Sequence, residues 1–341
     1  METEAAPTPL RIGILGAARI APMALIRPAR SCPEVTIYGI AARVPARAGQ
    51  FQLKHGITKA YPSYEAMLRA DDVDAIYNPL PNGLHCEWTI RSLEAGKHVL
   101  CEKPFASNAA EAERMAAAAE HTGKKLMEAF HYRYHPLAAR LREVIDGGEL
   151  GAIRHIETSM CIPLPFFNDI RYQYDLGGGA MMDTGCYAAH LLRHLAGAEP
   201  EEVVSARPTL RSPDVDRAME ADVRFADGRT GRLRCALFSA RNLVRVHAIV
   251  RGERGEMRVL NPFLPHFYHR LTISTPQGTR TEHVRGDATY LHQLRAFAAH
   301  VRDDAPIPTT PADSIANMRL IDAVYDRAGL RRRGEAIGRA A

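Results

Sequence analysis

Long apolar runs are missing from this sequence. No run approaches the roughly 20 residues that a helix needs to cross a bilayer. The first ten residues carry two glutamates and no basic segment, so no secretory signal peptide is predicted there. We therefore expect a protein of the cytoplasm that neither spans a membrane nor is exported.

Closely spaced metal ligands are also missing. The six cysteines are widely separated and form no C-x-x-C pair, which argues against zinc sites and favours reduced, structural thiols. Two histidine pairs have helical spacing, His131 with His135 and His190 with His194, but neither has an obvious third ligand. We expect no bound metal ion.

Lysine is scarce, because only six of the 44 basic residues are lysine and all six precede position 126. Arginine serves wherever a generic cation is needed, so a lysine in a special setting is informative. The net charge of +5 is scattered, and only Arg331, Arg332 and Arg333 form a cluster. This is weak evidence for a nucleic acid partner, and none is expected.

The length of 341 residues favours two domains, and the first part of the chain has its own pattern. Predicted strands cover 10–15, 35–42, 75–78, 98–101 and 125–129, with predicted helices between them. This alternation predicts an α/β domain over residues 1–130 with a parallel, doubly wound sheet.

A different pattern begins after Pro136. A helix (137–147) and a strand (153–161) are followed by a Gly-Gly-Gly segment that opens a helix over 181–195. Strand candidates then follow one another from 203 to 259, with turn signals at 227–228 and 252–255, which predicts a large, open, mostly antiparallel sheet.

The remaining residues complete a second, α+β domain over 131–330. Its closing helices, 289–302 and 311–328, could pack back on the first domain, and the Arg-rich tail (331–341) is expected to fray. One face of the open sheet has no predicted helix to cover it. We therefore expect a homodimer or homotetramer that forms through this face.

The first strand ends in a dinucleotide-binding fingerprint. It runs from Gly13 to Ala21 between a strand and a helix, with Gly16 at the tight turn. Ala18 stands where a glycine usually lets the pyrophosphate approach the backbone. We expect Gly16, Ala18, Arg19 and Ile20 to bind a dinucleotide in a Rossmann fold, although a small-residue turn without nucleotide remains an alternative.

The end of the second strand favours NADP over NAD. An acidic residue at this position holds the ribose hydroxyls of NAD, whereas arginine holds the extra phosphate of NADP. Here the sequence reads Ala41-Ala42-Arg43, with Arg47 one helical turn further on. The alternative is that both arginines are ordinary solvated residues.

Four separated segments are distinctive: Asn78-Pro79-Leu80-Pro81-Asn82 with His85, Glu102-Lys103-Pro104, residues 128–136, and residues 177–187. In these segments, and in their order and spacing, the chain resembles the Gfo/Idh/MocA oxidoreductases, the family of glucose-fructose oxidoreductase and inositol dehydrogenase. The resemblance covers nearly the whole chain. With a tyrosine at position 187, the chain is similar to the branch of the family that contains dihydrodiol dehydrogenases, aldose dehydrogenases and some sugar ketoreductases.

The resemblance implies roles for individual residues. Lys103 would lie beside the nicotinamide and the substrate hydroxyl, Tyr187 would give or take a proton, and Asp183 would orient the substrate. The implied cofactor-binding residues outside the fingerprint are Asn78, Pro79, Leu80, Asn82, His85, Glu102 and Lys103.

The spacing of Asp183 and Tyr187 agrees with these roles. Residues four apart on a helix project from one face, so both side chains could converge on one substrate oxygen. We also expect the ammonium of Lys103 to lower the pKa of the phenol. The alternatives are that Asp183 only caps the helix and that Tyr187 only packs in the core.

Arg133, Arg171 and His190 are candidate substrate contacts. The sequence thus predicts an NADP-dependent oxidoreductase that moves a hydride to or from a CH–OH or C=O carbon of an aldose or cyclic diol. One alternative is a reductase of a nucleotide-linked keto sugar. Another is a non-catalytic NADP-binding redox sensor.

Overall fold

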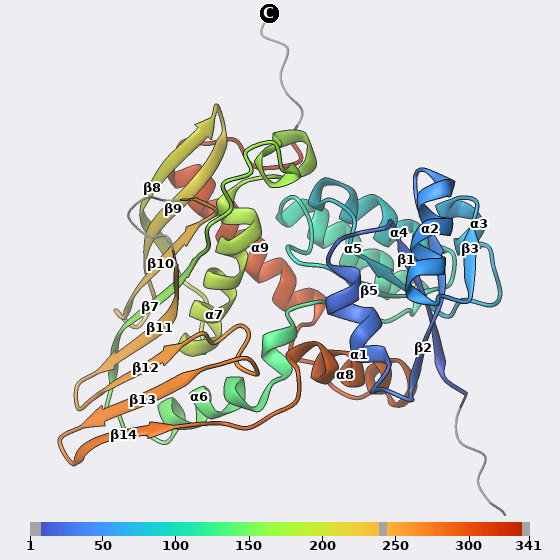
Figure 1. Ribbon diagram of the computed structural model, residues 1–341. Coiled ribbons are helices and arrows are strands. Elements are labelled where there is room, and N and C mark those ends of the chain that lie inside the picture. The colour runs from blue at the N-terminus through green and yellow to red at the C-terminus, as the bar shows by residue number, and fades with distance from the viewer. Residues whose placement is uncertain (1–7, 239–243, 336–341) are drawn as a thin grey trace, which may run out of the picture.

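The computed structural model describes residues 8–238 and 244–335, which fold into two parts, each built on its own sheet (Figure 1). The N-terminal sheet is parallel and six-stranded, in the order β3-β2-β1-β4-β5-β6. Its strands are β1 (Leu10–Leu15), β2 (Val35–Ala41), β3 (Lys59–Tyr61), β4 (Ala75–Asn78), β5 (His98–Cys101) and β6 (Leu126–Glu128). The strand order reverses beside β1, and open α/β sheets bind ligands at the carboxyl ends of strands at such a point.

Helices cover this sheet much as expected. They are η1 (Pro22–Ile26), α1 (Arg27–Ala29), α2 (Pro45–His55), α3 (Tyr64–Leu68), α4 (His85–Glu94) and α5 (Ala109–Thr122). Strand β3 was not predicted, because an edge strand of three residues is too short to show an alternating pattern. The helix predicted after the fingerprint begins with the wider turn of η1 rather than with a regular α-helical turn.

The second sheet has eight strands in the order β14-β13-β12-β11-β7-β10-β9-β8. Only β7 and β10 run parallel, and the other neighbours are antiparallel. The strands are β7 (Ile153–Cys161), β8 (Glu202–Ser212), β9 (Val215–Arg224), β10 (Thr230–Ala236), β11 (Arg245–Gly252), β12 (Glu256–Leu260), β13 (Arg270–Thr275) and β14 (Gly278–Glu282). The fold is therefore the predicted one: a parallel sheet followed by a large, mostly antiparallel sheet.

Helices lie on the inner face of this second sheet. They are α6 (Pro136–Asp146), the π-helical turn η6 (Met181–Gly185) and α7 (Cys186–Ala196), which continues η6. Almost all of α7 is buried, and it packs on β7 and β10. The inner face of the sheet thus supports α7, the helix that carries Tyr187.

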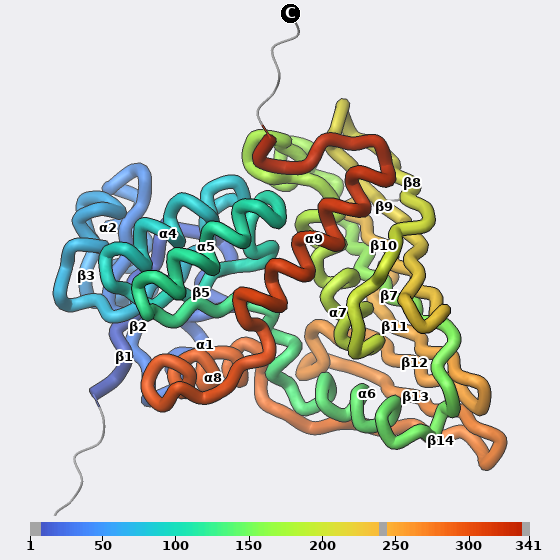
Figure 2. The backbone as a smooth tube through the Cα atoms, turned by 180° about the vertical axis from the view of Figure 1, so that it is seen from behind, coloured from blue at the N-terminus to red at the C-terminus, as the bar shows by residue number. Residues whose placement is uncertain are grey.

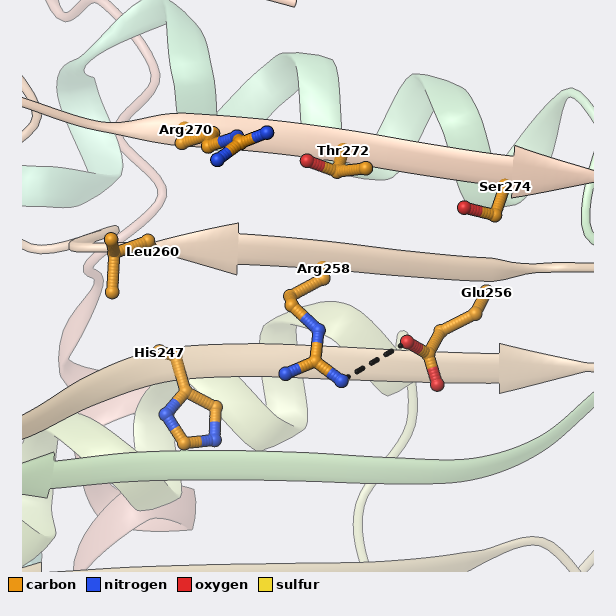
Figure 3. Close-up of a pocket in the computed structure, with 7 residues that line it drawn as sticks. All are labelled: His247, Glu256, Arg258, Leu260, Arg270, Thr272 and Ser274. Carbon is orange, nitrogen blue, oxygen red and sulfur yellow. Dashed lines mark hydrogen bonds and ion pairs between the residues drawn. The ribbon is translucent and has the colours of Figure 1, made fainter. Parts of the chain in front are cut away.

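The outer face of the second sheet carries ion pairs rather than a bare apolar surface. Glu157 on β7 pairs with Arg234 and Arg251 on the two flanking strands, and Asp222 pairs with Arg232. The outer face continues over β11 to β13, where Figure 3 shows a shallow depression lined by His247, Glu256, Arg258, Leu260, Arg270, Thr272 and Ser274. Assembly through this face stays a prediction, and it would join charged surfaces.

The two closing helices contact the N-terminal domain. Helix α8 (Thr289–Asp303) packs beside α1, and Leu294 and Phe297 belong to the same apolar cluster as Ile12 on β1. Helix α9 (Pro311–Arg327) packs against α5 of the first domain and α7 of the second, as the reverse view in Figure 2 shows. Among the described helices, none has the length and apolar character that crossing a membrane requires.

The arginine-rich segment after α9 was expected to fray, but its described part, residues 331–335, is held by ion pairs. Arg331 pairs with Asp214, Arg332 with Asp326, and Arg333 with Asp216. The side chain of Arg333 is fully buried. The expectation was wrong for residues 331–335 because Arg331 and Arg333 find acidic partners 117 positions earlier in the chain, which no local pattern signals. The remainder of the tail lies outside the described residues.

Candidate functional site

The centre of the candidate site is an ion pair between the two domains. Lys103 follows β5, and Asp183 lies in η6 just before α7. The Lys103 Nζ lies 3.2 Å from Asp183 Oδ1 and 3.1 Å from the Asp183 backbone oxygen. Their side chains are only 16% and 15% exposed. A lysine from the first domain therefore meets the carboxylate that the sequence pattern assigned to the same site.

Arg171 makes the carboxylate doubly paired. It lies in the short helix η4 (Ile170–Tyr172), and its Nε is 3.0 Å from Asp183 Oδ2. Burial favours the neutral acid, but the cations of Lys103 and Arg171 outweigh it and hold the pKa of Asp183 below its usual value. Burial alone would lower the pKa of Lys103, but the negative charge of Asp183 outweighs burial, and the pKa of Lys103 lies above its usual value. Both groups are charged at neutral pH.

Tyr187 lies in the same cluster, one turn after Asp183. The Lys103 Nζ is 4.9 Å from the centre of its ring, and the Tyr187 hydroxyl lies 3.0 Å from Nε2 of His131. Burial raises the pKa of Tyr187 well above its usual value. The expectation of a lowered phenol pKa was therefore wrong, because in this arrangement burial dominates and the ammonium faces the ring and Asp183.

His131 was missed as a site residue. Its Nδ1 lies 2.9 Å from the Thr289 hydroxyl, so Tyr187, His131 and Thr289 form a hydrogen-bonded chain. Burial and the nearby Lys103 lower the pKa of His131 to about 3, which makes the imidazole neutral. The only signal in the sequence was the position of His131 within residues 128–136, because its contacts are long-range.

A chain of alternating charges leads from this cluster to the dinucleotide turn. Arg171 Nη1 lies 3.0 Å from Asp169, and Asp169 is 3.1 Å from the Arg19 guanidinium. The Arg19 side chain is 90% exposed, so this last pair contributes little stability. It nevertheless places a residue of the fingerprint beside the loop that carries Arg171.

The turn after β1 suits a dinucleotide pyrophosphate. Gly16 adopts a φ of +83°, which favours glycine, and its amide donates to the Ala41 carbonyl. Ala18 leaves the turn free of a bulky side chain. Among the described residues, no acceptor is supplied to the backbone amides of Arg19 and Ile20. Such amides at the start of a helical segment can hold phosphate oxygens.

Arg43 and Arg47 lie at the neighbouring strand end. Ala41, the last residue of β2, is in register with Leu15 at the end of β1, so both arginines follow the strand beside the fingerprint. Both are exposed, and within residues 8–238 and 244–335 neither has an ion-pair partner. They are available to bind a phosphate from solution.

Three predicted cofactor contacts instead support the loops around Lys103. Asn78 is fully buried and donates to the His85 carbonyl and to Thr89. Both ring nitrogens of His85 lie 2.8 Å from backbone oxygens, those of Leu80 and Pro104. Glu102 accepts a hydrogen bond from a tyrosine on β4. These side chains hold the backbone in place, and their contact with a cofactor stays a prediction.

Three other predicted contacts are placed on these loops. Pro79 and Leu80 follow β4 directly, and the Leu80 side chain lies near Gly16, because a Cβ on that glycine would be 3.1 Å from it. Asn82 donates to the Gly177 carbonyl at 3.0 Å. This bond joins the loop after β4 to the glycine segment before Asp183.

Two predicted substrate contacts lie away from the cluster. His190 is 2% exposed, and its ring nitrogens bind Tyr132 at 2.6 Å and Asp313 at 2.8 Å. The Arg133 guanidinium lies 3.3 Å from His194, about two helical turns beyond Tyr187. His190 is thus buried with its nitrogens occupied, and Arg133 lies at the end of α7 away from Asp183. Contact of either residue with the substrate stays a prediction.

The described residues contain no group of three or more His, Cys, Asp or Glu side chains that could hold a metal ion. All six cysteines are free and buried. The contacts described above assign Lys103, Asp183, Tyr187 and His131 to the acid–base cluster.

Comparison with known proteins gives matches along most of the chain. The description "Oxidoreductase family, NAD-binding Rossmann fold" matches residues 10–130, and "GFO/IDH/MocA C-terminal domain" matches residues 138–258. D-xylose 1-dehydrogenase (NADP(+)) 2 from Haloferax volcanii is 35% identical, over 94% of this chain and 97% of that protein. Trans-1,2-dihydrobenzene-1,2-diol dehydrogenase from Xenopus laevis is 31% identical over 60% of this chain and 62% of its own length.

A solved structure shares the entire architecture. The 3-ketoreductase from Actinomadura kijaniata, in complex with NADP and TDP-benzene, superposes with a TM-score of 0.86 and is 33% identical. The match covers 95% of this chain and 98% of that one.

Proposed function

Because the chain belongs to the Gfo/Idh/MocA oxidoreductase family, we propose that it transfers a hydride between NADP and a CH–OH or C=O carbon of a sugar or cyclic diol. The observation that carries this proposal is the buried cluster of Lys103, Asp183 and Tyr187 beside the carboxyl end of β5. Open α/β sheets bind their ligands at this edge. The reaction belongs to the oxidoreductases that act on CH–OH groups.

The cluster supplies the proton chemistry that hydride transfer requires. Bound nicotinamide would accept or donate the hydride. The ammonium of Lys103 is positioned to donate a hydrogen bond to the substrate oxygen and to stabilise negative charge there. The phenol of Tyr187 is protonated at neutral pH and can give its proton to that oxygen when a carbonyl is reduced.

Asp183 and His131 position these two groups. Asp183 fixes the Lys103 ammonium by accepting hydrogen bonds on its carboxylate Oδ1 and on its backbone oxygen. The neutral imidazole of His131 holds the Tyr187 hydroxyl and is itself held by Thr289. Arg171 is the predicted substrate contact that reaches the cluster, and its side chain is 40% exposed.

NADP is the preferred cofactor in this proposal. The exposed guanidinium groups of Arg43 and Arg47 lie at the strand end where the 2′-phosphate would bind, and no acidic residue stands between them. The names of the xylose dehydrogenase and of the ketoreductase complex also include NADP.

The first substrates to test are free aldoses, because the xylose dehydrogenase is similar over its full length. The second candidate is a keto sugar linked to a nucleotide, for which the complex of the Actinomadura ketoreductase with TDP-benzene is the reason. A nucleoside diphosphate would need cations near the cluster, and the exposed Arg19 and the partly exposed Arg171 are the candidates.

A homodimer or homotetramer through the outer sheet face, acting in the cytoplasm, completes the proposal. The charged strands of this face favour an association that weakens as salt rises. Light scattering that shows a stable monomer at micromolar concentration would contradict it.

The test is a substrate screen that follows the absorbance of the reduced cofactor. NADP is supplied with aldoses and dihydrodiols, and NADPH with keto sugars and nucleotide-linked keto sugars, each repeated with NAD or NADH. Turnover of free aldoses supports the first candidate, and turnover restricted to nucleotide-linked substrates supports the second. NADPH binding without turnover of any substrate would instead favour the redox sensor.

A further inference from the structure

The buried guanidinium of Arg333 touches the segment that leads into the candidate site. Its Nη2 lies 3.1 Å from Asp216 Oδ1, and its Nε donates to the Gly178 carbonyl. The rings of Tyr325 and Tyr174 flank it, at 4.2 Å and 5.0 Å from the guanidinium carbon. Arg333 and Asp216 are both fully buried, so this is an internal ion pair rather than a surface one.

The partner carboxylate holds the start of the turn that carries Asp183. Asp216 accepts hydrogen bonds from the backbone amide of Met181, at 2.7 Å, and from the Tyr325 hydroxyl, at 2.9 Å. The amide of Asp183 donates to the Gly179 carbonyl at 3.0 Å. One buried carboxylate thus fixes the backbone two residues before Asp183, and Arg333 supplies its counter-charge.

The fit around this segment is tight. Gly179 has a φ of +133°, and a Cβ there would lie 2.4 Å from Asp216 Oδ1 and 2.8 Å from Arg333 Nη2. A Cβ on Gly178 would meet the backbone of Gln173 and Arg171. The glycines therefore allow the ion pair to sit directly against the backbone of the turn.

Arg333 also reaches the domain that carries Lys103. Its backbone oxygen accepts a hydrogen bond from Asn108, at 2.7 Å, at the start of α5. The side chain of Arg333 therefore holds the turn of Asp183 while its backbone is fastened to the first domain. A residue in this position can set how the lysine and the aspartate meet.

We propose that Arg333 is a positioning residue for hydride transfer, which fixes the turn of Asp183 against Lys103 through Asp216 and Gly178. This inference rests on the proposed function. Removing the guanidinium leaves a buried carboxylate without a counter-charge, so the turn must rearrange or take up water and a proton. A misplacement of about 1 Å at a reacting group can cost about 100-fold in rate.

The experiment compares Arg333→Ala, Arg333→Lys and the matched control Arg332→Ala. Arg332 is the neighbouring residue, but it pairs with the half-exposed Asp326 and, at 3.9 Å, with Asp322 rather than with the turn. We expect Arg333→Ala to lower kcat by about 10- to 100-fold while the Kd for NADPH stays within about twofold. Lysine can keep one contact, so Arg333→Lys should be intermediate, and millimolar guanidinium should restore part of the rate of Arg333→Ala.

Hydrogen–deuterium exchange provides a readout that needs no turnover. In Arg333→Ala, the amides of residues 177–187 should exchange faster, while those of 13–21 should not change. Arg332→Ala should change neither segment. If the wild-type protein turned over no substrate, the proposed function would fail, yet the exchange result would still report on the positioning role.

Three results would overturn the inference. One is a folded Arg333→Ala protein with the wild-type kcat and unchanged exchange in 177–187. Another is an equal loss of activity in Arg332→Ala. If Arg333→Ala does not fold, Arg333→Lys decides, and a lysine variant with wild-type kcat and wild-type exchange refutes the role of the guanidinium.

Discussion

The two ends of the candidate site are built differently. At the cofactor end, the turn after β1 offers backbone amides, and Arg43 and Arg47 extend into solvent. At the catalytic end, Lys103 and Asp183 are mostly buried and already paired. Within the described part of the chain, Arg43 and Arg47 at the cofactor end have no ion-pair partner, whereas the charges of Lys103 and Asp183 are already paired.

This difference follows from what each end must do. A phosphate arrives with its own charge, so an exposed arginine can bind it without first giving up another partner. A proton-transfer group must already be in position when the reaction occurs, because fixed dipoles and charges act most strongly where water is excluded. The cofactor end therefore has solvated arginines, whereas the catalytic end has Lys103, one of only six lysines in the sequence.

The largest expected effect comes from Lys103→Ala, which removes the central cation of the catalytic end. We expect kcat to fall by about 10³-fold or more, because both charge stabilisation and the support of Asp183 are lost. NADPH should still bind, since the fingerprint and the arginines are intact, and fluorescence titration measures this. Lys59→Ala, which breaks a partly exposed ion pair with Asp72, is the control. Wild-type turnover in the Lys103 variant would refute the assigned chemistry.

Tyr187→Phe tests the same end with a smaller change. The ring can keep its contacts with Phe130 and Phe263, but the hydroxyl that faces His131 is lost. We expect kcat to fall by about 10²-fold with little change in KM, since the proton donor is removed. Tyr268→Phe, at an exposed position, should leave both constants unchanged. Full activity without the hydroxyl would mean that another group donates the proton.

Arg43→Ala probes the cofactor end. Loss of one charge-assisted contact to the 2′-phosphate should weaken NADPH binding by about tenfold and leave NADH binding unchanged. Arg47→Ala should act in the same direction. Arg30→Ala, another exposed arginine of this domain, is the control for general charge loss. An equal loss of affinity for both cofactors would show that Arg43 does not read the phosphate.

The smallest effect concerns stability near the catalytic end. Burial raises the pKa of Glu128 to about 8, and neither carboxylate oxygen has a hydrogen-bond partner among the described residues. Its ordinary pKa is 4.5. Above that value the unfolded chain releases the proton while the folded chain retains it, so stability falls as pH rises toward 8.

Glu128→Gln removes this dependence. Between pH 5 and pH 8, the Tm of the wild-type protein should fall by a few degrees more than that of the variant, as measured by differential scanning calorimetry. Parallel Tm curves for the two proteins would show that Glu128 ionises normally in the folded state.

Local patterns were sufficient to predict most of the fold. The alternation of strands and helices, the turn at Gly16 and the hairpin turns of the second sheet are features of neighbouring residues. The edge strand β3 was missed because three residues show no periodicity. The π-helical turn that carries Asp183 was taken for regular helix because side-chain spacing alone does not distinguish them.

The site was predicted where short motifs name the residue, and missed where contacts span the chain. Lys103, Asp183 and Tyr187 lie together, as the resemblance implied. His131 meets Tyr187 across 56 positions, and Arg333 meets Asp216 across 117, and no local pattern signals either pair. The burial of Tyr187 was also invisible in the sequence, so the direction of its pKa shift was misjudged.

The position of Arg333 has a consequence for the order of events during synthesis. Translation proceeds from the N-terminus at about 5 to 20 residues per second, and N-terminal domains generally fold first. Arg333 is translated after Asp216, after Gly178 and after the whole parallel sheet. The buried counter-charge behind Asp183 can therefore be added only after nearly all of the described chain has been made.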